Sequence, residues 1–397
     1  MSKLDELITE LCPEGVKYKK IKQVYKRLKG TPITAGKMKE IDNPNGEIRI
    51  FAGGKTVINA MEKDIPNANI TRVPAVLVQS RGVIDAVYYD KPFTFKNEMW
   101  AYTADNEVAV KYLYYVLKSN LSYFRKAASG MGSLPQISLR VTEEFVIPVP
   151  PLPVQQEIVR ILDNFTELTA ELTAELTARR KQYEYYRDLL LTDLNEDTVK
   201  WISLKECTLP TSNIKWSLED EATTYKYIDL TSVDRELHYI TETQEINKNN
   251  APSRAQQIVK AGDILFATTR PLLKRYCLID SEYDGQICST GFCVLRANTD
   301  IVLQKWVLYH IASSSFYYHV EKYQQGASYP AISDANVKDY RIPVPPIEEQ
   351  ECIVAILDRF DALCNDLTSG IPAEIETRQK QYEYYRDKLL SFKEVTA

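Results

Sequence analysis

The sequence lacks the residue patterns that mark several classes of protein. Its seven cysteines form no Cys-x-x-Cys pair and its three histidines are scattered, which predicts reduced, mostly buried thiols and no metal site. No apolar run reaches the ~18 residues of a membrane span, and the N-terminus has no signal-peptide core. With 397 residues, 44% of them hydrophobic, we expect a soluble, cytoplasmic protein of two or three domains.

Motifs for catalysis are also missing. The chain has no Gly-x-x-x-x-Gly-Lys-Ser/Thr loop for nucleoside triphosphates and no Asn/Asp-Pro-Pro-aromatic tetrapeptide of an amino-methyltransferase. No carboxylate-plus-lysine cluster of nuclease type and no recognisable Ser-His-Asp triad stands out. These absences favour a binding protein; an enzyme with an unrecognised active site is the alternative.

Charge is unevenly distributed along the chain. The net charge is −5, yet residues 1–153 hold 22 Lys/Arg against 16 Asp/Glu, a net of +6. The excess is concentrated in residues 17–29, where seven of thirteen are basic. This run is compatible with a solvated helix face or with a surface that lies along phosphates.

The chain is an internal duplication. Residues 147–165 (IPVPPLPVQQEIVRILDNF) match residues 342–360 (IPVPPIEEQECIVAILDRF), and KQYEYYRD occurs at both 181–188 and 380–387. A Gly-small-x-Pro loop precedes each block, GSLPQIS at 132–138 and, with one more residue before the proline, GASYPAIS at 326–333. Earlier still, the apolar runs AVLVQSRG and DILFATTRP each end in a polar tip with an arginine. Both halves therefore share one order of elements.

Two long amphipathic helices are predicted after the proline-rich strands. Residues 155–191 contain no Pro or Gly and carry apolar side chains three or four positions apart. A helix over these residues would span roughly 55 Å. The second copy begins at 348 and should break or kink at residues 369–372 (SGIP). Two such helices joined through a globular domain most naturally pack antiparallel.

The first helix contains Thr-Ala-Glu-Leu twice in tandem. Removing or adding one copy shortens or lengthens the helix by ~6 Å and turns its end by about 40°. An adjustable spacer and an ordinary coiled-coil segment are both compatible with this repeat.

These features together resemble one family, the specificity subunits of type I restriction-modification enzymes. The two IPVPPxxxQxxIVxILDxF blocks, the paired KQYEYYRD helix ends and the TAEL tandem carry the resemblance, which covers essentially the whole chain. It implies an α+β fold: two globular α/β target-recognition domains separated by two long helices in an antiparallel coiled coil, with an internal pseudo-two-fold. The domains would be 1–153 and 196–346, and the helical regions 154–195 and 347–397.

The resemblance also implies a function and partners. Such a subunit is non-catalytic: each domain reads one half of a bipartite, asymmetric site in double-stranded DNA, and TAEL repeats set the unread gap. Two modification (adenine methyltransferase) subunits and two restriction (motor-nuclease) subunits would join it. No cofactor is expected in this chain, because S-adenosylmethionine, ATP and Mg would belong to the partners. A coiled-coil adaptor that binds only protein is the competing interpretation.

Candidate DNA contacts follow from residue chemistry, because recognition domains diverge where they confer specificity. Arginine can bond guanine and glutamine adenine in the major groove, whereas lysines along the basic run suit phosphates. The candidates are Lys19, Lys20, Lys26, Lys29, Ser80, Arg81, Ser133 and Gln136 in the first half, and Thr268, Thr269, Arg270, Lys274, Arg275, Gln325, Ser328 and Tyr329 in the second.

Candidate partner contacts lie in the repeated helix ends. The tyrosines of KQYEYYRD cannot all face one seam, and tyrosine is enriched at protein interfaces. We therefore expect partner contacts from Tyr183, Tyr186 and Arg187, and from their copies Tyr382, Tyr385 and Arg386. An intrahelical pair of either arginine with Glu184 or Glu383 is equally compatible with the sequence.

Overall fold

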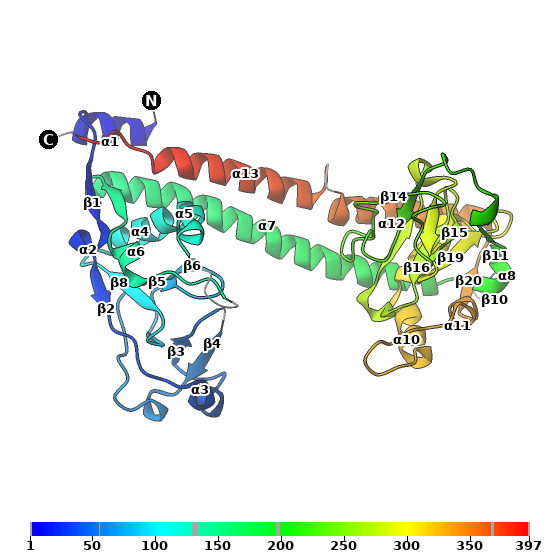
Figure 1. Ribbon diagram of the computed structural model, residues 1–397, viewed down its shortest axis with the longest axis horizontal. Helices are drawn as coiled ribbons and strands as arrows, with labels where there is room; N and C mark the ends of the chain where they lie inside the picture. The colour runs from blue at the N-terminus through cyan, green and yellow to red at the C-terminus, as the bar shows by residue number, and fades with distance from the viewer. Residues whose placement is uncertain (1, 55, 129–133, 196–198, 367–368, 396–397) are drawn as a thin grey trace. The chain divides into compact units, whose positions relative to one another are not determined.

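The structure is a computed structural model that describes residues 2–54, 56–128, 134–195, 199–366 and 369–395 (Figure 1). By contact the chain divides into two units, each described by itself below. Unit 1 comprises Met1–Leu172 and Ile375–Ala397, and unit 2 comprises Thr173–Glu374. Each unit thus contains one globular domain and one end of both long helices. Within the described residues, no helix combines the length and apolarity needed to cross a membrane, and no cluster of metal-ligating side chains occurs.

Unit 1 is a mixed α/β domain. Its strands are β1 (Lys17–Lys20), β2 (Lys26–Leu28), β3 (Ile48–Phe51), β4 (Val57–Ala60), β5 (Ala75–Gln79), β6 (Asp85–Tyr89), β7 (Phe93–Phe95), β8 (Trp100–Thr103) and β9 (Val146–Val149). Its helices are α1 (Lys3–Leu11), α2 (Ile21–Val24), α3 (Ala35–Ile41), α4 (Glu107–Ser119), α5 (Leu121–Lys126), α6 (Leu139–Glu143) and the start of α7 (Leu152–Thr192). A four-stranded sheet has the order β2-β8-β5-β6, and a three-stranded sheet has the order β4-β3-β7.

Unit 2 repeats this plan. Its strands are β10 (Lys200–Ser203), β11 (Thr208–Leu209), β12 (Ser212–Asn213), β13 (Tyr225–Ile228), β14 (Gln244–Ile246), β15 (Ala255–Ile258), β16 (Ile264–Ala267), β17 (Tyr276–Leu278), β18 (Ile287–Ser289), β19 (Phe292–Ala297) and β20 (Arg341–Val344). Its helices are α8 (Leu204–Cys207), α9 (Gln304–Ala312), α10 (Ser314–Tyr323), α11 (Asp334–Lys338), α12 (Ile347–Asn365) and the start of α13 (Ile371–Leu389). The sheets have the orders β11-β19-β16-β17 and β12-β15-β18-β13-β14.

The duplication is visible strand by strand. The four-stranded sheets pair their strands in the same order, and β1 pairs with β9 in the same register as β10 with β20. Helix α4 packs on β5 and β6, as α9 packs on β16 and β17. The second sheets differ, with three strands in unit 1 and five in unit 2. A shared frame therefore carries a part that diverges between the halves.

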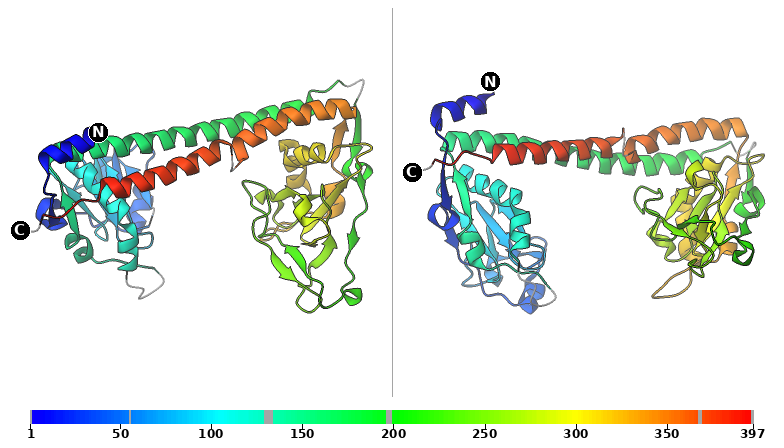
Figure 2. Two further views of the ribbon diagram at one scale, coloured as in Figure 1. Left: turned by 90° about the horizontal axis from the view of Figure 1, so that it is seen from above. Right: turned by 45° about the horizontal axis from the view of Figure 1, so that its top comes forward.

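The predicted pairing of the long helices is confirmed within each unit. In unit 1 the ring of Phe165 on α7 stacks on Tyr385 of α13, and in unit 2 Tyr186 of α7 stacks on Phe360 of α12. Figure 2 shows α7 alongside α13 in unit 1 and alongside α12 in unit 2. The predicted helix break is also confirmed, since α12 ends at Asn365 and α13 begins at Ile371.

The break is enforced by a close backbone approach. A Cβ on Gly370 would lie 2.6 Å from the carbonyl oxygen of Ala362, so no other residue fits there without movement.

The cysteines are free thiols, and six of the seven are buried, as the sequence predicted.

Equivalent side-chain contacts in the two units join each globular domain to its long helix. Asp163 on α7 accepts from Lys111 Nζ at 2.6 Å and from Tyr115 Oη at 2.5 Å, both on α4. In unit 2, Asp358 on α12 accepts from Lys305 Nζ at 2.7 Å and from Tyr309 Oη at 2.5 Å, both on α9. The same three residue types thus hold each domain against the helix that follows it.

Candidate nucleic-acid interface

In unit 1, the end of β5 is bonded to the Gly-x-x-Pro loop. The amide of Ile137 donates to the Ser80 carbonyl at 2.9 Å, and the amide of Gly82 donates to the Pro135 carbonyl at 2.9 Å. Arg81 lies between these two bonds, opposite Gln136. Two segments that are far apart in the sequence therefore form one exposed tip.

In unit 2, the end of β16 forms the same tip. The amide of Ile332 donates to the Thr268 carbonyl at 2.9 Å, and the amide of Arg270 donates to the Pro330 carbonyl at 2.7 Å. Thr269 lies opposite Ala331, which also exchanges two backbone hydrogen bonds with Gln325. The strand end and the Gly-x-x-Pro loop, each of which supplied candidate DNA contacts, therefore lie together in both units.

The hydrogen bonds fix which residues correspond between the tips. Ser80 corresponds to Thr268, Arg81 to Thr269 and Gly82 to Arg270. The two arginines that sequence comparison placed together are therefore one residue out of register. The sequence could not reveal this shift, because the short runs align equally well either way.

Several predicted DNA contacts have hydroxyl or guanidinium groups that are occupied within the protein. Ser80 is buried and its Oγ donates to the Glu98 carbonyl at 2.5 Å, while the Thr268 Oγ1 donates to the Gly291 carbonyl at 2.9 Å. Arg275 Nη1 donates to the carbonyls of Leu230 and Val233, each at 2.6 Å. These three side chains hold the tips in shape.

The remaining tip candidates are open to solvent to differing degrees. Thr269 is half-buried, and Ser133 lies outside the described residues. The exposed candidates are Arg81, Gln136, Arg270, Lys274, Gln325, Ser328 and Tyr329. Tyr329 is 71% exposed.

Two basic residues at the unit 2 tip adopt a left-handed backbone. Arg270 has φ 49° and Lys274 has φ 55°, and they bracket the 3₁₀ turn η3 (Pro271–Leu273). Left-handed geometry costs an L-residue roughly 1–2 kcal/mol, because its Cβ crowds the following carbonyl. The Arg270 guanidinium carbon lies 4.5 Å from the centroid of the Tyr329 ring, a cation–π contact.

The basic run at residues 17–29 forms strands and not a long helix. It comprises β1, the single turn α2 and β2, so the interpretation as a solvated helix face is wrong. Lys20 and Lys22 both bond the carboxylate of Glu144, and these hydrogen bonds lower the pKa of Glu144 to about 2. Lys19, Lys26 and Lys29 are exposed, and Lys20 is half-buried.

The repeated helix ends divide into buried and exposed faces. Tyr183 and Arg187 are buried in unit 2, where the Arg187 guanidinium lies over the Tyr183 ring. Arg187 also pairs with Asp188, as Arg386 pairs with Asp387. The alternative pair of either arginine with a glutamate of its own helix is not among the described contacts. Tyr382 and Arg386 are half-buried, while Tyr186 and Tyr385 are exposed.

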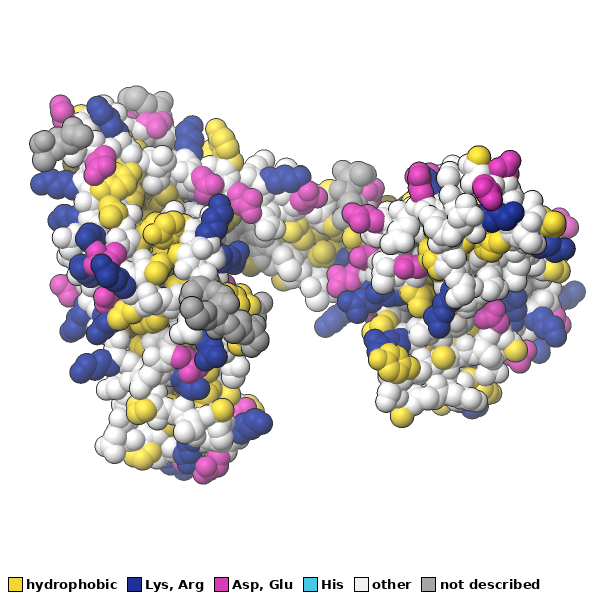
Figure 3. Space-filling view, viewed as in Figure 1, with side chains coloured by type: hydrophobic (Ala, Val, Ile, Leu, Met, Phe, Trp, Pro, Cys, Tyr) yellow, Lys and Arg dark blue, Asp and Glu magenta, His cyan; other side chains and the backbone are white. Residues whose placement is uncertain are grey.

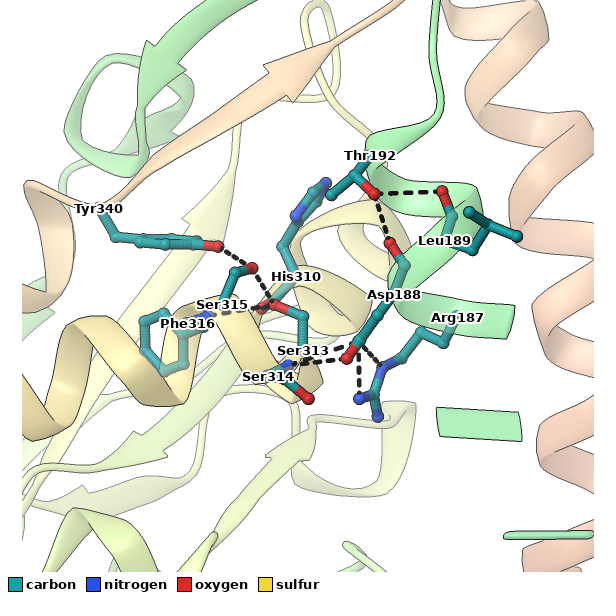
Figure 4. Close-up of polar contacts among 10 residues, drawn as sticks. All are labelled: Arg187, Asp188, Leu189, Thr192, His310, Ser313, Ser314, Ser315, Phe316 and Tyr340. Carbon is teal, nitrogen blue, oxygen red and sulfur yellow. Dashed lines mark hydrogen bonds and ion pairs between the residues drawn. The ribbon is translucent and has the colours of Figure 1, made fainter. Parts of the chain in front are cut away.

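The most exposed tyrosines of the repeat are Tyr185 and Tyr384, at 64% and 63%. Neither tyrosine was among the partner contacts predicted from the sequence. Their place on the face opposite the helix–helix contacts could have identified them as the exposed tyrosines of each repeat. Figure 4 shows the inner face in unit 2, where the Asp188 carboxylate points at the backbone nitrogen of Ser314, 3.3 Å away, at the start of α10. A carboxylate is stabilised at a helix N-terminus.

Comparisons with known proteins give a consistent result. The family model described as type I restriction modification DNA specificity domain matches residues 13–179 and again residues 203–377. The EcoR124I/EcoR124II specificity subunit of Escherichia coli is 37% identical over 305 residues, which is 72% of each chain. The MpnII specificity subunit of Mycoplasma pneumoniae is 27% identical over 67% of this chain and 94% of its own.

A solved structure extends the comparison to the fold. The crystal structure of a type I restriction-modification S subunit from M. genitalium aligns over 95% of this chain and 96% of its own. Its TM-score is 0.55 at 16% identity, a similarity of fold. The two family matches coincide with the two repeated domains and their helices.

Proposed function

This chain belongs to the family of type I restriction-modification DNA specificity subunits, and we propose that it reads a bipartite, asymmetric DNA site, one half with each domain. It is the non-catalytic subunit of such a system. The observation that carries the proposal is the pair of exposed tips, which share their backbone hydrogen bonds and differ in side chains. A common frame with different reading groups suits two different half-sites.

The reading groups have the right chemistry for DNA. The exposed Arg81 and Gln136 in unit 1 carry donors for base edges, and so do Arg270 and Gln325 in unit 2. The exposed lysines of the basic run would contact phosphates and position the domain without specifying sequence. Because the whole chain carries a net charge of −5, part of the phosphate neutralisation would come from partner subunits.

The long helix would set the gap between the half-sites. Helix α7 is continuous through both TAEL repeats, and the division between the units falls at Leu172, within this tandem. The hydroxyls of Thr169 and Thr177 each donate to the carbonyl four residues earlier, at 2.8 and 2.9 Å, as threonine hydroxyls within a helix can. One repeat can be added to or removed from this stretch with the helix still continuous.

One repeat corresponds to a small step along DNA. Four helical residues advance ~6 Å and turn about 40° beyond a full turn. One base pair of B-DNA advances about 3.4 Å and turns roughly 35°. The rotations are similar, which supports a helix that acts as a ruler for the spacing of the two domains.

The helix ends would bind two copies of one partner. Exposed Tyr185 and Tyr384 occupy equivalent positions, so a pseudo-two-fold presents the same surface twice. We propose that two adenine methyltransferase subunits bind there and that two motor-nuclease subunits join the assembly. S-adenosylmethionine, ATP and Mg would then be bound by those subunits, and this chain would bind no cofactor.

Methylation mapping of the complex tests the proposal. The chain is co-expressed with its methyltransferase subunit, and modified adenines are located by long-read sequencing. The proposal predicts one split motif of two unlike halves. The double variant Arg81→Ala with Gln136→Ala should weaken recognition of one half-site and leave the other half-site unchanged. A soluble complex that produces no motif would contradict DNA reading and favour the protein-only adaptor.

A further inference from the structure

One backbone position differs between the two tips in a way that changes their chemistry. In unit 1 the residue bonded to the loop proline is Gly82, with φ 76°, a conformation that glycine adopts without cost. In unit 2 the same position is Arg270, with φ 49°. A glycine would relieve this strain, so the reason for an arginine at this position must lie in what its side chain contacts.

The side chain of Arg270 is exposed but held in place. Its guanidinium carbon lies 4.5 Å from the ring centroid of Tyr329, and Tyr329 belongs to the Gly-x-x-Pro loop. That loop is fixed on both sides, by Arg270 N to the Pro330 carbonyl and by two bonds between Gln325 and Ala331. Stacking leaves the edge of a guanidinium plane free for hydrogen bonds.

We propose that Arg270, stacked on Tyr329, is the specificity-determining residue of the second domain and reads a guanine in its half-site. This inference rests on the proposed function. A planar guanidinium can bond guanine O6 and N7 together, and a side chain already fixed by stacking loses less freedom on binding. Figure 3 shows basic and hydrophobic side chains next to each other over the loop that follows α10.

The two domains would therefore read DNA by different means. Gly82 offers no side chain at this position, and Arg81 precedes it by one residue, opposite Gln136. The first domain must then place its reading groups from neighbouring positions. An asymmetric site follows from this difference even though the frames are alike.

Lys274 provides a comparison within the same turn, because it is also an exposed DNA-contact candidate but its side chain lies on a different ring. It has the same left-handed backbone, with φ 55°, and its Nζ lies 5.0 Å from the ring of Tyr317. Tyr317 is 7% exposed and belongs to the core of unit 2, whereas Tyr329 is 71% exposed. Replacing Lys274 by glycine therefore relieves the same backbone strain without touching the proposed reading group.

The experiment compares Arg270→Gly, Arg270→Lys and Lys274→Gly with the unchanged chain, each in complex with the methyltransferase subunit. The motif of the unchanged complex is first found by methylation mapping. Binding is then measured on duplexes in which each base pair of the motif is replaced in turn. Thermal unfolding checks the fold, and Arg270→Gly should melt no lower than the unchanged chain because glycine suits the position.

The inference predicts a local loss of discrimination. Arg270→Gly and Arg270→Lys should reduce discrimination at one guanine of the second half-site by about 5- to 150-fold. The first half-site should be read as before. Lys274→Gly, which can remove only a contact shared by all duplexes, should change affinity equally on every duplex without a loss at that guanine. Unchanged discrimination in Arg270→Gly, or an equal loss on all duplexes with a shallower salt dependence, would overturn base reading by Arg270. If the unchanged complex shows no motif, the proposed function itself fails.

Discussion

Phe165 stacks on Tyr385 in unit 1, with ring centroids 5.6 Å apart and planes at 24°. In unit 2 the corresponding ring of Phe360 stacks on Tyr186, at 6.2 Å and 20°. Each ILDxF block thus packs against the KQYEYYRD segment of the other copy. The ILDxF block and the KQYEYYRD segment are therefore the two sides of one contact, and this contact occurs once in each unit. This explains why both segments are present twice.

We expect this stacking to stabilise each helix pair. A stacked aromatic pair contributes about 0.5–1.5 kcal/mol beyond the area it buries. The double-mutant cycle of Phe165→Leu and Tyr385→Leu should show a coupling free energy in that range in urea unfolding. The cycle of Phe360→Leu and Tyr186→Leu serves as the symmetric control, and additive effects in both cycles would contradict the stacking account.

The aspartates that join domain and helix should be equally important in both units. Asp163 and Asp358 accept from a lysine and a tyrosine in the same geometry. A hydrogen bond to a charged group contributes about 1.5–3 kcal/mol, so Asp163→Asn and Asp358→Asn should each lower the free energy of unfolding by ~1–2 kcal/mol. Lys111→Met added to Asp163→Asn should cost little more, because the partner is already weakened. A change below ~0.3 kcal/mol in both single variants would contradict this role.

Unit 2 should lose stability in mild acid through two histidines, the buried His310 and the half-buried His238. His310 is 2% exposed and burial lowers its pKa to about 3, while the pKa of His238 is lowered to about 4 by burial. The unfolded chain has histidine pKa values of about 6.5 and binds protons first as the pH falls. This contribution to stability is complete above pH 6.5 and is lost between 6.5 and the folded pKa.

The change can be measured with a variant. At pH 5, 1.5 units below the unfolded pKa, each of these two histidines lowers the free energy of unfolding by up to ~2 kcal/mol. Trp306 lies beside His310, with ring centroids 5.1 Å apart, and its fluorescence follows unfolding of unit 2. His310→Leu should lose less free energy of unfolding between pH 8 and pH 5 than the unchanged chain. An identical loss in both would contradict the assignment to His310.

The exposed tyrosines of the repeated helix ends should bind partner and not support the fold. Tyr185→Ser and Tyr384→Ser should weaken binding of the methyltransferase subunit by at least tenfold each, with unfolding midpoints unchanged. Tyr318→Ser is a matched control, because Tyr318 is 73% exposed on α10 in unit 2 and lies outside the repeat. Equal methyltransferase affinity in all three variants, by isothermal titration, would move the partner surface elsewhere.

Much of the fold followed from the sequence because the duplication marks it directly. The matching blocks define the frame, and apolar residues three or four positions apart predict the long helices. The structure confirms the pairing of these helices and the break at Gly370. The basic run was harder, because alternation over four residues at β1 looks like helix periodicity in so short a segment.

The candidate site was less accessible to sequence reasoning. The sequence supplied candidates from the strand end and from the Gly-x-x-Pro loop, but their pairing and the one-residue shift between Arg81 and Arg270 depend on backbone hydrogen bonds. Burial of Ser80 and Thr268 depends on distant carbonyls at Glu98 and Gly291. Tertiary contacts, which short motifs do not encode, decided which polar side chains face solvent.

Deleting residues 173–176 and mapping adenine methylation by the complex tests the central claim most directly. The account predicts that both half-sites stay the same while the unread gap shortens by about one or two base pairs, as the helix loses ~6 Å and about 40°. A variant with Thr173→Ala and Glu175→Lys keeps the helix length and should keep the gap. An unchanged gap in the deletion variant, with full methylation at the original site, would contradict the proposal that the length of α7 sets the gap between the half-sites.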